Sequence, residues 1–218
     1  MEKERTELVL ILDKSGSMAG LESDTIGGFN SMLEKQKKAS GECNITTVLF
    51  DHNYELLHDR IDIRGVSKLT QEDYTVGGST ALIDAIGKTI FKINNVQKNT
   101  AKEFKAEKVL FVIITDGDEN ASRDCNAEDV KRLIQEQKEK YGWEFIFLGA
   151  NIDAVSTASS LGIGPNLSAE YLADSEGTRL SFDAMSDAIL EYRQSKSPSP
   201  SISKEHFEKV KDDVKHRK

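Results

Sequence analysis

Apolar segments of strand length alternate with segments of helical period along most of this chain, and this alternation constrains the fold more than any other feature. The run Leu8–Leu12 is continuously apolar, which is typical of a strand buried on both faces. Ile26, Phe29 and Leu33 then recur at i, i+3 and i+7 and predict a helix over 24–39. Such alternation predicts an α/β fold, a doubly wound and mostly parallel sheet with helices on both faces.

Two of the strands can be placed within this sheet. The segment Val109–Thr115 is the most apolar, so we expect it near the centre. The segment Tyr54–Arg60 follows Asn44–Phe50 after only three polar residues, which suits a hairpin and predicts one antiparallel edge strand. The whole pattern predicts a six-stranded sheet with strands over 8–12, 44–50, 54–60, 109–115, 145–149 and 166–172. It predicts helices over 24–39, 80–95, 153–161 and around 185–192, and one more from the cap Asn126 to just before Gly142.

Composition excludes several classes of function. The 218 residues carry a net charge of −8 with no stripe of Lys and Arg, which argues against nucleic acid as the main partner. The longest aliphatic and aromatic run, Val109–Ile114, is far shorter than the roughly 20 residues that cross a bilayer. The first residues show no signal-peptide cleavage pattern, which favours a cytoplasmic location. Cys43 and Cys125 stand outside any CxxC pattern, which argues against a disulfide framework and a zinc site.

The charge pattern divides the chain at the segment 197–201, which contains Pro198 and Pro200. Proline cannot continue a helix, and it biases the preceding residue toward an extended conformation. We therefore expect one domain over 1–195 and a charged tail over 196–218. The sequence favours a frayed tail, with a short amphipathic helix as the alternative, because Phe207, Val210 and Val214 would share one helical face.

Polar residues that can bind a ligand follow three of the predicted strands. In doubly wound sheets, ligands bind beyond the carboxyl ends of the strands, where the strand order reverses. If the first strand neighbours the strand over 109–115, the three loops after these strands meet there. We expect exposed loops with oxygen donors at the following positions: Asp13, Ser15 and Ser17 after the first strand, Thr80 in the segment Gly77-Gly78-Ser79-Thr80, and Asp116 after the central strand.

These donors are all oxygen atoms, since neither cysteine is adjacent in the sequence and both His52 and His58 are expected in the hairpin, away from the cluster. Hard all-oxygen coordination selects Mg²⁺ or Mn²⁺, with Ca²⁺ also possible, over zinc or copper. Two carboxylates leave a dication electrophilic, so an open coordination position would favour an anionic oxygen from a partner. We expect the rim around this site to be formed by Lys14, Met18, Gly77, Gly78 and Asp118.

The three motifs together resemble the metal-ion-dependent adhesion site (MIDAS) of von Willebrand factor type A domains. The D-x-S-x-S motif, the Thr of GGST and the Asp after an apolar strand all match, and the element order agrees over residues 6–195. The resemblance implies strand order 3-2-1-4-5-6, Mg²⁺ or Mn²⁺ held by the five residues, and an Asp or Glu of a protein partner completing the coordination. It is closest to the stand-alone bacterial or phage cytoplasmic type, which implies an AAA+ ATPase or a stress-response protein as partner.

The same cluster has an enzymatic interpretation, a metal-dependent phosphohydrolase, because a carboxylate-bound metal can polarise a phosphoryl oxygen. A haloacid-dehalogenase-like pattern would need an Asp at the position of Ser15. The sequence also contains no GxxxxGK[ST] or GxGxxG motif and no Ser-His pair at neighbouring strand ends. The binding module is therefore the preferred hypothesis, and we expect no enzymatic activity.

Overall fold

The computed structural model describes residues 5–197 and 200–217. Their centre is one six-stranded sheet in the order β3-β2-β1-β4-β5-β6. Every neighbouring pair is parallel except β2 and β3, which form the antiparallel edge hairpin that the sequence predicts. The strands span Arg5–Asp13 (β1), Glu42–Phe50 (β2), Tyr54–Asp62 (β3), Lys108–Thr115 (β4), Glu144–Ala150 (β5) and Ser168–Tyr171 (β6).

The centre of the sheet is the pair β1 and β4, which confirms the central position expected of the apolar segment Val109–Thr115. All residues of β4 are buried, and β1 is buried from its second residue onward. The chain leaves β1 toward β2 on one side and returns to β4 on the other, so the strand order reverses between β1 and β4. The pairing of β1 with β4 ends with Leu12 and Ile114. The last residues of the two strands, Asp13 and Thr115, therefore lie side by side.

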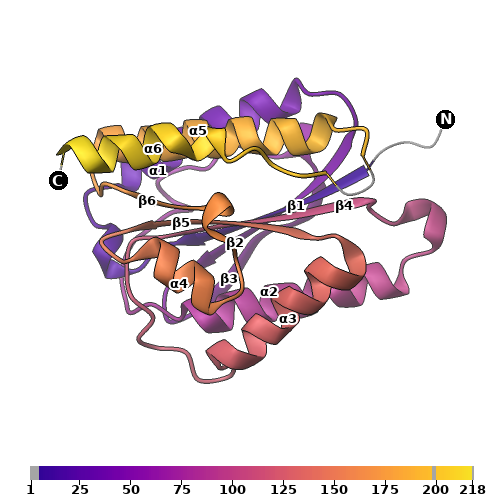
Figure 1. The fold of residues 1–218 in the computed structure, drawn as a ribbon, viewed down its shortest axis with the longest axis horizontal. Coiled ribbons are helices and arrows are strands. Elements are labelled where there is room, and N and C mark those ends of the chain that lie inside the picture. The colour runs from indigo at the N-terminus through magenta and orange to yellow at the C-terminus, as the bar shows by residue number, and fades with distance from the viewer. Residues whose placement is uncertain (1–4, 198–199, 218) are drawn as a thin grey trace.

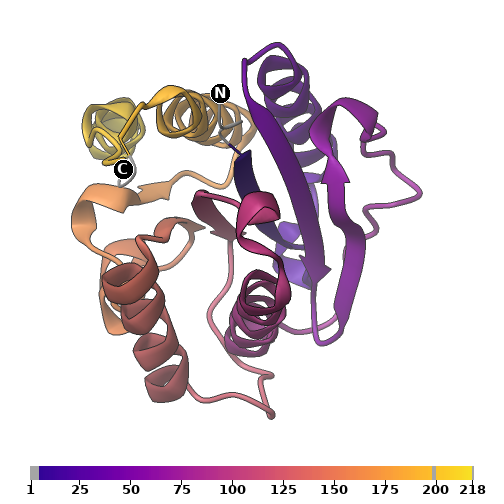
Figure 2. The same cartoon turned by 90° about the vertical axis from the view of Figure 1, so that its right-hand side faces the viewer.

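Helices cover both faces of the sheet, and the three layers are visible in Figures 1 and 2. One face packs against helices α1, α5 and α6, and the other packs against α2, α3 and α4. The helices span Glu22–Lys37 (α1), Leu82–Asn99 (α2), Ala127–Tyr141 (α3), Ala154–Ser160 (α4), Ser175–Gln194 (α5) and Glu205–Arg217 (α6). In the described ranges, none of these helices combines the length and the apolarity that a membrane span requires.

Side chains alternate along the buried strands and build a separate core on each face. Leu10 of β1 joins the core beneath α1, α5 and α6, where it packs with residues such as Phe29 and Tyr192. Phe111 belongs to the opposite core, and its ring stacks on that of Trp143 with centroids 5.5 Å apart. Trp143 is therefore a packing residue at the end of the sheet opposite the three loops.

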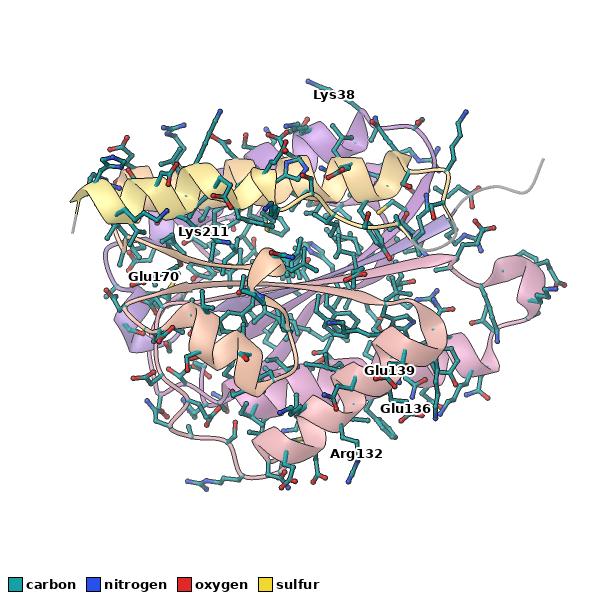
Figure 3. The ribbon with its side chains drawn as sticks, viewed as in Figure 1. Lys38, Arg132, Glu136, Glu139, Glu170 and Lys211 are labelled. Carbon is teal, nitrogen blue, oxygen red and sulfur yellow. The ribbon has the colours of Figure 1, made fainter. Side chains whose placement is uncertain are left out.

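Helix α3 shows how closely local sequence sets the bounds of an element. The Asn126 side chain accepts a hydrogen bond from the Asp129 N–H at 2.8 Å, which caps the first turn. Gly142 ends the helix in the left-handed conformation, with φ of 65°. In Figure 3 the labelled side chains of α3, Arg132, Glu136 and Glu139, point away from the sheet. This helix is amphipathic, because Val130 and Ile134 are buried on its other face.

The expectation of a frayed tail is wrong for residues 205–217, which form helix α6. Phe207 and Val210 are at most 1% exposed, because they pack into the core beside α5 and β6. Arg217 at the end of α6 donates to Asp174 at 2.6 Å, and Asp174 is the cap of α5. The alternative reading as an amphipathic helix is correct. The domain boundary at residue 195 stays a prediction.

Candidate metal site

The carboxylate of Asp13, at the end of β1, is held by hydrogen bonds from the following turn and from the neighbouring strand β4. Asp13 Oδ1 accepts the Ser15 N–H at 2.7 Å, which closes a tight turn of the kind that Asp favours. Asp13 Oδ2 accepts the Thr115 hydroxyl at 2.6 Å, so the end of β4 fixes the other oxygen. Tyr74 donates its hydroxyl to the Asp13 carbonyl. Both oxygens of this carboxylate therefore have a fixed direction.

A chain of hydroxyls joins this loop to the loop after β4. Ser15 Oγ lies 3.0 Å from Ser17 Oγ, and Ser17 Oγ donates to Asp116 Oδ1 at 2.6 Å. The other oxygen of Asp116, Oδ2, is buried and has no hydrogen-bond partner among the described residues. A buried carboxylate oxygen without a partner is costly, and such an atom in a native structure requires an explanation, such as an ion.

Gly117 shows that the third loop reaches the same point. A Cβ atom built on Gly117 would lie 3.0 Å from Ser17 Oγ, 3.2 Å from Thr80 Oγ1 and 3.9 Å from Ser15 Oγ. Three hydroxyl oxygens from two loops thus surround one small space beside the backbone that carries Asp116. The meeting of the three loops, expected if β1 neighbours β4, is confirmed by the sheet order and by these contacts.

Backbone hydrogen bonds hold the GGST segment against the first loop. Gly16 N–H donates to the Gly78 carbonyl at 3.0 Å, and Gly77 N–H donates to the Lys14 carbonyl at 2.9 Å. Gly78 has φ of 76°, a region that favours glycine. A Cβ atom at this position would also lie 2.3 Å from His52 Nδ1. His52 is thus adjacent to this loop, in contrast to the expectation from the sequence.

The cluster is more buried than loop positions suggest. Asp13, Ser15, Thr80 and Asp116 are at most 3% exposed, because the three loops pack on one another, whereas Ser17 is open to solvent. Burial raises the pKa of Asp13, although hydrogen bonds from Thr115 and Ser15 oppose this effect. Burial, opposed by the hydrogen bond from Ser17 and reinforced by the charge of Asp13, raises the pKa of Asp116 to about 6. Both carboxyl groups lie where a cation would favour their charged form.

The donor set fits a hard divalent cation. In the described part of the chain, no group of three His, Cys, Asp or Glu side chains is placed to hold a metal ion. The cluster instead offers three hydroxyls and two carboxylates, and one of these carboxylates, that of Asp116, has a buried oxygen that lacks a partner. Oxygen ligands of this kind suit Mg²⁺, Mn²⁺ or Ca²⁺. Asp13, Ser15, Ser17, Thr80 and Asp116 are the residues that could hold such an ion.

The residues expected at the rim have different environments. Asp118 is exposed in the loop directly after Asp116. Lys14 pairs its ammonium group with Glu55 on β3. Met18 is 1% exposed, because the short 3-10 helix Gly16–Met18 turns its side chain into the core. The side chain of Met18 is therefore not part of an exposed rim.

Sequence reasoning missed several residues that support the site. The sequence pattern marks Thr115 only as the last residue of a strand and assigns no contact to Glu119. Glu119 in fact accepts from the N–H groups of Ala121 and Ser122 and from that of Ile83 on α2. An Asp, Glu or Asn shortly after a strand end was the only available signal. It does not reveal which distant helix the side chain will reach.

Comparison with known proteins supports the fold through structure alone, since neither a protein-family model nor a curated protein matches the sequence. The chain is similar to manganese-loaded Plasmodium vivax TRAP protein, with 18% identity over 82% of this chain and 73% of that one and a TM-score of 0.58. It is also similar to a von Willebrand factor type A protein from Catenulispora acidiphila, with 15% identity and a TM-score of 0.57, covering 87% of this chain and 43% of that one.

A third similar structure is proximal thread matrix protein 1 from the mussel byssus, which has a zinc-occupied MIDAS motif. Identity is 12% over 86% of this chain and 46% of that one, with a TM-score of 0.59. The chain thus spans about half the length of this protein and of the Catenulispora protein. The sheet order, the antiparallel edge hairpin and these likenesses agree, and we conclude that the chain has the fold of von Willebrand factor type A domains.

Proposed function

We propose that this chain is a divalent-cation-dependent protein-binding module. Mg²⁺ or Mn²⁺ would be held by Asp13, Ser15, Ser17, Thr80 and Asp116, and an Asp or Glu of a protein partner would complete its coordination. The observation that carries this proposal is the buried and unpartnered Asp116 Oδ2 in a cluster of hydroxyls. No surrounding side chain donates a hydrogen bond to this oxygen among the described residues, so a bound cation would stabilise it.

Charge supports a role in binding an anionic group. When bound, the cation supplies an electrophilic centre, because the two carboxylates only balance its charge and the three hydroxyls add none. Asp13 is held by Thr115 and Ser15, so its orientation does not depend on a partner. Ser17 keeps the site open to solvent, which gives a partner carboxylate access. These features favour capture of an acidic residue over burial of a purely structural ion.

The similar structures support the choice of ion class. Metal-bound forms include the manganese-loaded Plasmodium protein and the mussel protein with zinc in its MIDAS motif. For this chain we propose Mg²⁺ or Mn²⁺, since the donors of its cluster are all oxygens. We further propose a cytoplasmic protein partner, an AAA+ ATPase or a stress-response protein, and no nucleic acid, given the net charge of −8.

The experiment compares Asp116→Ala with Asp118→Ala, because Asp118 is an exposed carboxylate in the same loop. Thermal unfolding is recorded in EDTA and in millimolar Mg²⁺ or Mn²⁺. An ion at 100 times its Kd stabilises a folded protein by about 2.7 kcal/mol. We expect wild type and Asp118→Ala to be stabilised by metal and Asp116→Ala not to be. A wild type with no response at millimolar metal would refute the site.

A second measurement addresses the binding function. Proteins captured from lysate by the wild type in Mn²⁺ are identified, and their binding is measured again with purified components in EDTA and with Asp116→Ala. Loss of binding in EDTA and loss of binding by Asp116→Ala would support the metal-dependent binding module. Loss of binding when one acidic residue of the partner is replaced would also support it. Hydrolysis of phosphate esters that disappears in Asp13→Ala would instead favour the phosphohydrolase hypothesis.

A further inference from the structure

Helix α2 begins without a side-chain cap of its own, although a threonine stands just before it. The residue at the cap position is Ala81, which makes no side-chain hydrogen bond to the first turn. Thr80 is a residue type that commonly caps helices through its hydroxyl. Here Thr80 Oγ1 lies instead in the metal-site cluster, near Ser17 Oγ and Ser15 Oγ. Other groups must therefore satisfy the first N–H groups of α2.

The β4–α3 loop, residues 116–126, supplies these groups. Glu119 Oε2 accepts the Ile83 N–H at 2.9 Å, and Ser122 Oγ accepts the Asp84 N–H at 3.0 Å. In the other direction, Asp84 accepts three N–H groups of the loop, those of residues 123–125, at 2.8–3.0 Å. The loop thus caps α2 from outside, and α2 in turn anchors the loop.

Asn120 lies between these anchors and bonds both backbone groups of Thr80. Its side-chain Oδ1 accepts the Thr80 N–H at 2.9 Å, and its own N–H donates to the Thr80 carbonyl at 3.0 Å. Ala121 N–H reaches the same carbonyl at 3.2 Å. The backbone of Thr80 is consequently fixed relative to the loop that begins with Asp116. Two of the three loops of the site are joined through one asparagine.

We propose that Asn120 is a positioning residue for the metal site. Glu119 and Ser122 accept the first N–H groups of α2, so the Thr80 hydroxyl is not needed as a helix cap. Asn120 fixes the Thr80 backbone, and this backbone places the hydroxyl near Ser17 before any ion binds. The site is therefore preorganised in the metal-free protein, and ion binding requires no rearrangement of the GGST segment. This inference rests on the proposed metal-dependent function. It adds a residue that would support the ion through the Thr80 backbone and that is not one of the five proposed ligands.

The test compares three variants of the full chain. Asn120→Ala removes the acceptor for the Thr80 N–H, and Asn120→Asp keeps an acceptor at the same position. Ser122→Ala is the matched control, because Ser122 caps α2 in the same loop without contacting Thr80. Two quantities are measured for each protein: hydrogen exchange of the Thr80 amide without metal, and the Kd for Mn²⁺ by titration calorimetry. Far-UV circular dichroism establishes that each variant is folded.

We expect Asn120→Ala to speed exchange of the Thr80 amide at least tenfold and to raise the Mn²⁺ Kd by 10- to 100-fold, the usual effect of losing an outer-sphere support. Asn120→Asp and Ser122→Ala should stay within about threefold of the wild type for Mn²⁺. An unchanged Kd in Asn120→Ala, or an equal loss in Ser122→Ala, would overturn the positioning role and leave the proposed function intact. A wild type that binds no Mn²⁺ would overturn both.

Discussion

The hydrogen bonds of Asp84 allow a quantitative prediction of how firmly the β4–α3 loop is attached. The Asp84 side chain is largely buried, and its carboxylate accepts the N–H groups of Arg123, Asp124 and Cys125. Burial raises the pKa of Asp84, but the three N–H donors outweigh this effect and the pKa lies below its usual range. The folded protein therefore stabilises the charged form. Replacing Asp84 with Asn should remove that stabilisation.

The magnitude follows from the geometry. An Asn oxygen can still accept from Asp124 and Cys125, but the amide nitrogen would face the Arg123 N–H and lose that bond. Hydrogen bonds to a charged acceptor contribute about 1.5–3 kcal/mol each, and neutral ones contribute about 1 kcal/mol. With the lower values, loss of one bond (about 1.5 kcal/mol) and weakening of two (about 0.5 kcal/mol each) predict that the free energy of unfolding falls by about 2.5 kcal/mol. For a chain of this size, Tm should fall by about 5–10 °C.

Urea denaturation followed by circular dichroism measures this change, with Asp124→Asn as the matched control. Asp124 is in the same loop and carries the same charge, but it pairs with Lys88 at the surface. An exposed pair of this kind contributes at most about 1 kcal/mol. With an m-value of about 3 kcal/mol/M, Asp84→Asn should lower the urea midpoint by about 1 M. A shift below about 0.2 M, or an equal shift in Asp124→Asn, would refute the reasoning.

Three further predictions concern the site, pH and the last helix. Gly117→Ala should abolish stabilisation by Mg²⁺ and Mn²⁺ in thermal unfolding, because the new methyl group would lie 3.0 Å from Ser17 Oγ; a full metal response would contradict this packing. Burial lowers the pKa of His58 below 6.5, so the unfolded chain binds the proton at His58 more readily and the contribution of His58 to stability decreases as pH falls below 6.5. Between pH 7.5 and pH 5.5, the free energy of unfolding measured in urea should change less favourably for the wild type than for His58→Gln. Equal changes in the two proteins would show that His58 does not cause this pH dependence. Phe207→Ala should lower the free energy of unfolding by about 3–5 kcal/mol and speed hydrogen exchange in α6, whereas a change below about 1 kcal/mol would mean that α6 adds little to the core.

The central strand and the edge strand could be predicted because each signal lies within a short window of sequence, whereas the full strand order was implied only by the resemblance to von Willebrand factor type A domains. A continuously apolar run such as Val109–Thr115 needs burial on both faces, so it belongs to the centre of a parallel sheet. A three-residue polar connection permits only a hairpin, which places β3 at the edge. The burial of His58 could not be predicted from a short window of sequence. The pairing of β2 with β3 shifts between Thr47 and Val48, and His58 is buried against Phe29 instead of exposed.

Part of the candidate site could also be predicted from short sequence motifs. Each oxygen donor stands directly after a strand, in a motif that can be read without knowing the fold, and the topology requires the ends of β1 and β4 to be adjacent. The burial of the cluster could not be read, because it arises only when the three loops pack on one another. The position of His52 could not be predicted either, because it depends on contact between the β2–β3 turn and Gly78.

By itself, the sequence determined the doubly wound architecture, the antiparallel edge and the cluster of oxygen donors at strand ends, since apolar periodicity and motif spacing are properties of neighbouring residues. Only the tertiary structure decided how Thr80 is held. Glu119, Asn120 and Asp84 act across some 40 positions of sequence, and a carboxylate or amide in a loop gives no sign of which distant N–H it will accept. That choice is made by packing of the loop on α2, where each unpaired backbone group must find a partner.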